Sequence, residues 1–136
     1  MAGDYLFYKR HYTDKSHDRQ IVAADTSTQH ADVISPKSAS HRIYIQKIIL
    51  SITTHAAQTI TFRDGAGTPL VIAAHTDSAT GLSVVEWDFG PKGTPLTIGE
   101  ELDIILSAAG IAATVHIEAY EKLDATISYL AGASLQ

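Results

Sequence analysis

The stretch His41-Arg-Ile-Tyr-Ile-Gln-Lys-Ile-Ile-Leu-Ser-Ile-Thr53 decides the fold, together with Thr54-His-Ala-Ala57, Gln58-Thr-Ile-Thr-Phe-Arg63 and Asp64-Gly-Ala-Gly67, which follow it. Its many Ile and Thr residues are typical of β-strands. A long strand, a short loop, a second strand and a tight turn follow one another, and this order predicts a β-hairpin. The turn itself explains its glycines by their tolerance of positive φ.

The apolar face of the first strand changes parity partway along it. Ile43 and Ile45 share one face by alternation, whereas Ile48 and Ile52 have the opposite parity. A continuous buried face therefore needs one extra residue near Gln46-Lys47, which is a β-bulge. A long strand that bends at a bulge suits a curved sandwich better than a flat sheet.

Composition limits the classes of protein that the chain can belong to. Its 136 residues suit one domain, and 45% apolar with 18% charged residues is ordinary for a globular chain. A net charge of −5 leaves no basic footprint, so we expect no nucleic-acid partner. Zero cysteines exclude disulfides and thiolate chemistry. We expect neither a signal peptide nor a membrane segment, because no sufficiently long apolar run occurs.

Residues 1–18 are predicted to form an N-terminal arm or strand. Tyr5, Leu6, Phe7 and Tyr8 make this segment apolar on both faces. Such a strand is either enclosed within the domain or covered by another subunit. Both alternatives stay open, and the second makes these four residues candidate partner contacts.

Residues 122–136 are predicted to form a C-terminal arm. Leu123, Ile127 and Leu130 are spaced by four and three, as on one face of a helix, yet the segment around Tyr129 favours β structure. We expect an extended arm. Its apolar residues Ile127, Tyr129 and Leu130 are further candidate partner contacts.

The rest of the chain alternates short apolar runs with polar turns. Strands are predicted at residues 19–24, 30–35, 69–74, 83–89, 96–98, 101–107 and 113–120, and polar turns at 13–18, 36–40 and 75–81. Trp87 lies on the same strand face as Val85 and Phe89, which predicts a core position. No helical period stands out. The pattern predicts an all-β, antiparallel, jelly-roll-like β-sandwich of about eight strands, with extended terminal arms, as a single domain over 1–136.

Seven histidines raise the question of a metal site. His116 and Glu118 share one strand face, as a histidine and a carboxylate do in double-stranded β-helix metal enzymes. Such sites need a third ligand, commonly two residues upstream, where Thr114 stands. We therefore interpret His116 and Glu118 as a solvent-facing polar pair, and expect no metal or other cofactor.

Three further patterns resemble catalytic or ligand-binding motifs, but each lacks a feature that its motif requires. The Asp64–Gly67 loop opens a strand, whereas a phosphate-binding loop opens a helix. The pairs Glu86 with Asp88 and Glu100 with Glu101 show no sign of the raised pKa that a glycosidase acid needs. The serines considered, Ser107 and Ser134, lack a nucleophile-elbow context. We expect a protein that is not an enzyme.

Residues 45–53, 58–65, 99–107 and 113–120 carry a resemblance to a known family. Their order of strands and turns resembles that of the jelly-roll decoration, or cement, proteins of tailed bacteriophages. The resemblance implies a homodimer or homotrimer that binds the major capsid protein across neighbouring subunits. It also implies synthesis in the host cytoplasm and a place on the capsid exterior.

The functional hypothesis is therefore a non-enzymatic virion structural protein that stabilises a phage head by bridging capsid subunits. One alternative is a carbohydrate- or receptor-binding sandwich of a phage tail or fibre. That alternative requires exposed aromatic rings, for which Tyr44, Tyr120 and Tyr129 are the candidates. A cupin-like metal enzyme is a third hypothesis.

Overall fold

The computed structural model describes residues 12–25 and 29–124. Ten strands lie within these ranges: β1 (Tyr12–Asp14), β2 (His17–Ile21), β3 (Gln29–Ile34), β4 (His41–Thr54), β5 (Gln58–Asp64), β6 (Val71–Asp77), β7 (Val84–Asp88), β8 (Thr94–Pro95), β9 (Leu102–Leu106) and β10 (Ala112–Leu123). No helix occurs in these two ranges. The chain is all-β, as its sequence predicts.

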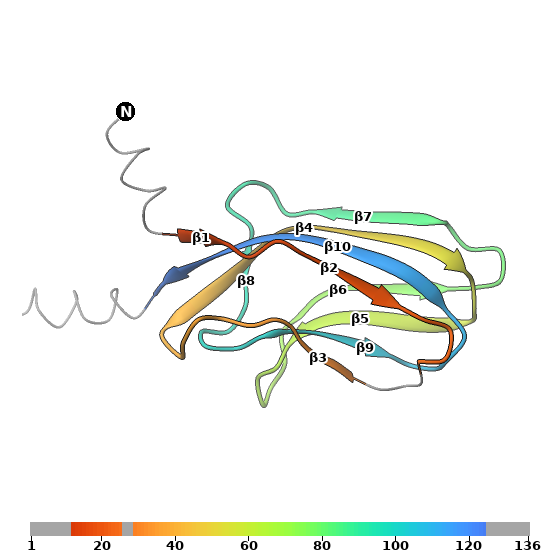
Figure 1. The fold of residues 1–136 in the computed structure, drawn as a ribbon, viewed down its shortest axis with the longest axis horizontal. Helices are drawn as coiled ribbons and strands as arrows, with labels where there is room; N and C mark the ends of the chain where they lie inside the picture. Colours follow the sequence, from red (N-terminus) through yellow and green to blue (C-terminus); the bar gives the residue numbers. More distant parts are fainter. Residues whose placement is uncertain (1–11, 26–28, 125–136) are drawn as a thin grey trace, which may run out of the picture.

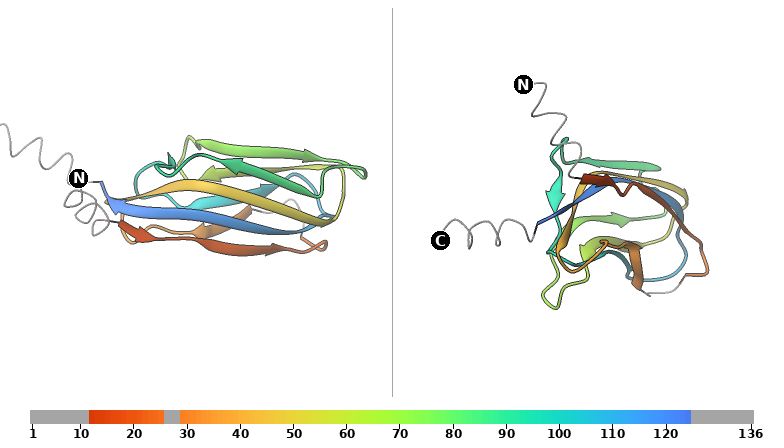
Figure 2. Two further views of the ribbon diagram at one scale, coloured as in Figure 1. Left: turned by 90° about the horizontal axis from the view of Figure 1, so that it is seen from above. Right: turned by 60° about the vertical axis from the view of Figure 1, so that its left-hand side comes forward.

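The strands form two antiparallel sheets that pack face to face (Figure 1). One sheet has the order β1-β10-β4-β7, with β2 also paired to β10 and β8 also paired to β4. The other has the order β3-β9-β5-β6. The right-hand view of Figure 2 shows the two layers from near one end of the sandwich. The prediction of an antiparallel β-sandwich is confirmed.

The connections between the sheets follow the jelly-roll pattern. Four of them join strands at matching positions in the two orders: β2 to β3, β9 to β10, β4 to β5 and β6 to β7. Such crossing connections build a double-sheet roll from about eight strands. The strands β1 and β8 are short additions to one sheet.

The hairpin predicted from residues 41–63 is wrong. β4 pairs with β10, β7 and β8, whereas β5 pairs with β6 and β9 in the opposite sheet. The loop 55–57 is therefore an arch between layers. The alternation of apolar and polar residues shows which face of a strand is buried. It does not show which strand lies beside it, because any neighbour of matching register can pair with it. The true hairpin of this region joins β5 to β6.

The predicted bulge is present at the expected place. Glu118 of β10 pairs with Lys47, and the next residue, Ala119, pairs with Ile45, so that Gln46 is the extra residue. The parity change follows from this, because Ile43 and Ile45 are fully buried before the bulge, as is Ile48 after it. A second irregularity leaves Thr53 unpaired between Ile52 and Thr54.

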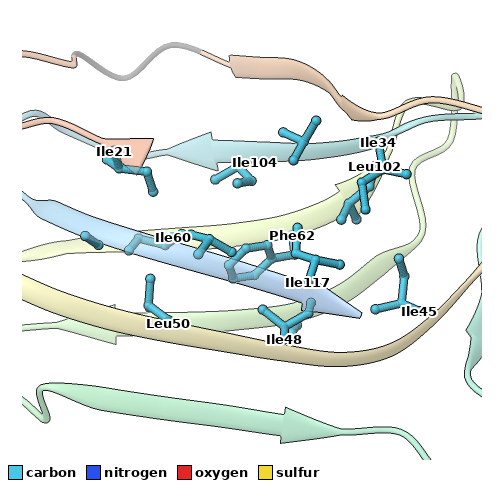
Figure 3. Close-up of a cluster of buried hydrophobic side chains, with 14 of the residues drawn as sticks. Ile21, Ile34, Ile45, Ile48, Leu50, Ile60, Phe62, Leu102, Ile104 and Ile117 are labelled. Carbon is cyan, nitrogen blue, oxygen red and sulfur yellow. The ribbon is translucent and has the colours of Figure 1, made fainter. Parts of the chain in front are cut away.

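The core between the layers consists of aliphatic side chains around Phe62 (Figure 3). Phe62 is fully buried and meets Trp87 edge to face, with 5.6 Å between ring centroids. The prediction that Trp87 packs on the core is confirmed. The largest buried side chains besides Phe62 are Ile21, Ile43, Ile45, Ile48, Leu50, Ile60, Leu96, Leu102, Ile104, Leu106 and Ile111.

Several predicted boundaries shift. Residues 13–18 contain parts of two edge strands, because Tyr12–Asp14 and His17–Ile21 both pair with β10. Their polar composition reflects exposure at an edge, where one face meets water. The strand predicted at 69–74 instead runs from Val71 to Asp77 and takes in the start of the predicted 75–81 loop. The predicted arms lie outside the described residues, except that β10 continues to Leu123.

The prediction that the turn at 64–67 uses its glycines for positive φ is wrong. The described glycines with positive φ are Gly90, Gly93, Gly99 and Gly110, so neither glycine of the 64–67 turn is needed for that reason. A Cβ at Gly65 would instead lie 2.4 Å from Oε1 of Glu101. The atoms it would meet are the end of the flexible Glu101 side chain, which can move aside, so this position favours a small residue without requiring glycine.

Candidate functional site: the β6–β7 edge

The candidate contacts Tyr5, Leu6, Phe7, Tyr8, Ile127, Tyr129 and Leu130 lie outside the described residues. They stay predictions. The described residues provide another candidate, on the side of the sandwich where β6 and β7 form the outer strands of the two sheets (Figure 2).

Two apolar patches lie at opposite ends of this β6–β7 edge. The Leu70 patch consists of Leu70, 46% exposed, and Val71, 57% exposed, at the start of β6. The Leu82 patch consists of Leu82, 68% exposed, and Val84, 60% exposed, at the start of β7. Because β6 and β7 run in opposite directions, the patches are separated by roughly the length of β6, about 20 Å at 3.4 Å per residue.

The backbone of β7 is also open to a partner. Ile52 N donates to the Ser83 carbonyl over 2.7 Å, and Phe89 N donates to the Gln46 carbonyl over 2.8 Å. In an antiparallel ladder these bonds alternate, so the N–H and C=O groups of Val84, Glu86 and Asp88 point away from β4. No described strand pairs with β7 on that side. An open edge of this kind is a place where another chain can pair.

The aromatic platform expected for carbohydrate binding is not presented to solvent. Tyr44 and Tyr120 stack on each other, with ring centroids 5.0 Å apart and planes inclined by 8°. Tyr120 is only 4% exposed and donates its hydroxyl to the Lys92 carbonyl over 2.7 Å. The ammonium of Lys122 covers the Tyr44 ring at 5.0 Å. Tyr129 lies outside the described residues. The prediction that Tyr120 is exposed is wrong, because its neighbours on the sheet cover it.

His116 and Glu118 face outward, as expected, with side chains 42% and 45% exposed. Asp18 of β2 joins them: His116 Nδ1 lies 2.5 Å from Asp18 Oδ1, and Nε2 lies 3.4 Å from Glu118 Oε2. The hydrogen bond to Asp18 raises the pKa of His116 above its ordinary value, and Glu118 adds to this while burial opposes it. The two carboxylates contact opposite nitrogens of the His116 ring. A single metal ion therefore could not bind one ring nitrogen and both carboxylates in this arrangement.

Within residues 12–25 and 29–124, no group of three histidine or acidic side chains has the geometry of a metal site. Nor does any helix of these ranges have the length and apolar character that crossing a membrane requires.

Asp64 serves the β5–β6 turn and is not part of a phosphate loop. Its carboxylate is fully buried and accepts hydrogen bonds from Leu70 N at 2.9 Å, Thr97 N at 3.0 Å and Thr97 Oγ1 at 2.5 Å, with a longer one from Ala66 N. Burial alone would raise the pKa of Asp64, but these hydrogen bonds outweigh burial and leave it below its ordinary value.

The prediction that the pair Glu100 and Glu101 shows no raised pKa is wrong for Glu100. Burial raises its pKa above the ordinary value, and the neighbouring charges of Glu101, Asp64 and Asp103 add to the effect. Glu86, by contrast, is exposed and faces Lys47 at 3.9 Å. Ser107 uses its hydroxyl structurally, since Oγ accepts from Thr59 N at 2.7 Å.

A cluster that sequence reasoning missed lies beside the Leu82 patch. His55 Nδ1 lies 3.0 Å from Asp77 Oδ1, and His55 Nε2 lies 3.5 Å from Ser83 Oγ. The three residues come from the arch after β4, the end of β6 and the loop before β7. No local motif links them, so only the topology of the roll could reveal their meeting.

Comparisons with known proteins give little further identification. No family model matches the chain. No curated protein matches it either. Among solved structures, it is similar to a chain from Bacillus endospore appendages, described as a family of disulfide-linked pili, with 10% identity, a TM-score of 0.47 and coverage of 83% of this chain and 88% of that one.

It is also similar to a chain of a virus-like particle of the extra small virus of the giant freshwater prawn Macrobrachium rosenbergii. The identity there is 11%, the TM-score is 0.41, and the match covers 81% of this chain and 79% of that one. Both TM-scores lie below 0.5, and we base no argument on these likenesses.

Proposed function

We propose that this protein is a structural protein of a virus particle, and specifically a decoration protein that binds the capsid exterior and bridges neighbouring capsid subunits. The supporting observation is the β6–β7 edge, which carries an apolar patch at each end and open backbone groups along β7. Such a role in assembly needs no catalytic step.

The spacing of the two patches is what favours bridging over a single contact. A rigid sandwich holds them about 20 Å apart, so the second contact forms at a high effective concentration once the first has formed. Two weak contacts can then exceed the affinity of either one by about 10²–10⁴. The terminal segments with Tyr5–Tyr8 and Ile127–Leu130 would supply further contacts to a capsid subunit or to a second copy.

The test is binding to capsids purified from a virus from which this coding sequence has been deleted. Leu82→Asp combined with Val84→Asp should weaken binding by about 10²-fold, because it removes one of two linked contacts. Leu70→Asp combined with Val71→Asp should act alike. Val22, which is 49% exposed beyond β2 on the opposite side, provides the control Val22→Asp.

The proposal predicts that the control binds like the wild type and that all variants keep the wild-type melting temperature within a few degrees. Equal binding by all variants, or no binding by the wild type, would overturn it. Light scattering of the purified protein measures separately whether it is a dimer or a trimer.

A further inference from the structure

The Ser83–His55–Asp77 cluster has the connectivity of a nucleophile, a base and a carboxylate that orients the base. Asp77 is the member of this cluster that the surrounding structure holds in place. Its side chain is fully buried, and Oδ2 accepts from Ala56 N at 3.1 Å in addition to its contact with His55. Burial alone would raise the pKa of Asp77, but the hydrogen bonds from His55, Ala56 and Ser78 outweigh it and lower the pKa.

An ionised carboxylate beside Nδ1 determines the tautomer of His55. Nδ1 must carry the proton in order to donate to Asp77, which leaves a lone pair on Nε2. That nitrogen lies 3.5 Å from Ser83 Oγ, so the contact must shorten when substrate binds before the proton can pass. The His55 side chain is 19% exposed, so the base is held in the protein yet remains reachable.

Ser83 is held in place independently of His55. Its carbonyl accepts from Ile52 N at 2.7 Å, which ties the residue to β4. The loop before it packs against Asp77 so closely that a Cβ at Gly81 would lie 2.3 Å from Asp77 Oδ1. His55 belongs to the arch, and His75 Nε2 also lies 3.7 Å from Asp77 Oδ1, so Asp77 has a structural role as well. What goes beyond that role is the approach of His55 Nε2 to Ser83 Oγ.

We infer that Ser83 is an activated nucleophile that attacks small uncharged esters, with His55 as the general base. Oγ would bond to the acyl carbon while its proton passes to His55 Nε2, and the ester bond to the departing alcohol would break as His55 returns that proton. Water would then attack the acyl carbon and give a proton to His55. The bond between the acyl carbon and Ser83 Oγ would break as His55 returns that proton to Oγ, and the carboxylic acid would leave.

The surroundings determine which esters fit. The N–H of Val84, the residue after the nucleophile, points away from β4 and is a candidate donor to the developing oxyanion. Leu82 and Val84 flank Ser83 and are both exposed, so they offer contact to a short apolar acyl group. The net charge of −5 disfavours anionic substrates.

The test uses two probes on the full chain: a fluorophosphonate, which labels activated serines, and 4-nitrophenyl butyrate. Peptide mass mapping should place the phosphonyl group on Ser83. Both Ser83→Ala and His55→Gln should abolish the label and lower ester hydrolysis by about 10²-fold, the usual contribution of a positioned base.

The chain offers matched controls. His116 also contacts an aspartate through Nδ1 but faces Glu118 instead of a serine, so His116→Gln should leave both readouts unchanged. Ser107→Ala tests another exposed serine. Free imidazole groups hydrolyse activated esters without any serine, and the phosphonate label separates that background from the proposed chemistry.

Label on another residue, absence of label, or unchanged hydrolysis in Ser83→Ala with an intact melting curve would each overturn the inference. Both readouts use the free protein without capsids, so failure of this inference and failure of the proposed function are distinguishable.

Discussion

At the scale of single residues, Asp64 shows how a polar group can organise a turn inside an apolar protein. Four hydrogen bonds converge on its buried carboxylate and tie the β5–β6 turn to Thr97, which precedes β9. A buried carboxylate would be costly without them. The sequence predicts a turn at this position but assigns it to the glycines, because a carboxylate that bonds a residue 33 positions away leaves no local pattern.

Replacing Asp64 by Asn should destabilise the protein by about 1–3 kcal/mol at pH 7. The amide keeps one acceptor but places its own N–H₂ group against donors, which leaves buried groups unpaired. Urea denaturation provides the measurement. Asp88→Asn is the control, since Asp88 is exposed and accepts only from Gly90 N; that change should stay within about 0.5 kcal/mol.

The same substitution should change the response to acid. Since the folded-state pKa of Asp64 is lowered, its contribution is fully present above the unfolded value of about 3.9 and is lost as pH falls through the folded-state value. Asp64→Asn should therefore flatten the loss of stability below about pH 4. A loss as steep as that of the wild type would contradict the assignment.

At the scale of elements, the bulge in β4 was predictable and the partner of β4 was not. Parity is a local property: isoleucines at both 45 and 48 can be buried only if one residue is added between them. Pairing is a global property, and β4 and β5 differ in it although they are adjacent in sequence. The Ser83–His55–Asp77 cluster was missed for this reason, because its members meet only after the sheets are assembled.

Deleting Gln46 should remove the bulge and keep the fold, at a cost of about 1–3 kcal/mol, whereas Gln46→Ala should cost about 1 kcal/mol. The deletion leaves Ile45 and Ile48 two residues apart, so plain alternation keeps both side chains buried. What the deletion loses is the bend at the bulge and the hydrogen bond from Phe89 N to the Gln46 carbonyl. The substitution keeps the parity and loses only the hydrogen bond from Gln46 Nε2 to the Pro91 carbonyl. Circular dichroism and urea denaturation of both variants provide the comparison. A deletion variant that does not fold would contradict this and show that the bend at the bulge is essential.

At the scale of the whole molecule, the two proposals meet at one end of the β6–β7 edge. Ser83 lies between Leu82 and Val84, which form the Leu82 patch. A capsid subunit docked on that patch must cover Ser83 as well. Capsid binding and reaction with a soluble ester therefore use the same part of the surface and should exclude each other.

Binding to capsids should accordingly protect Ser83 from the fluorophosphonate. We expect the labelling rate to fall at least tenfold for particle-bound protein, because docking through the Leu82 patch excludes the probe from His55 and Ser83 together. The Leu70→Asp/Val71→Asp variant, which keeps the Leu82 patch, should still be protected once enough capsid is added to bind it. If capsid-bound wild-type protein is labelled as fast as free protein, the capsid contact lies elsewhere on the sandwich. That result would not change the reactivity of Ser83 measured in solution.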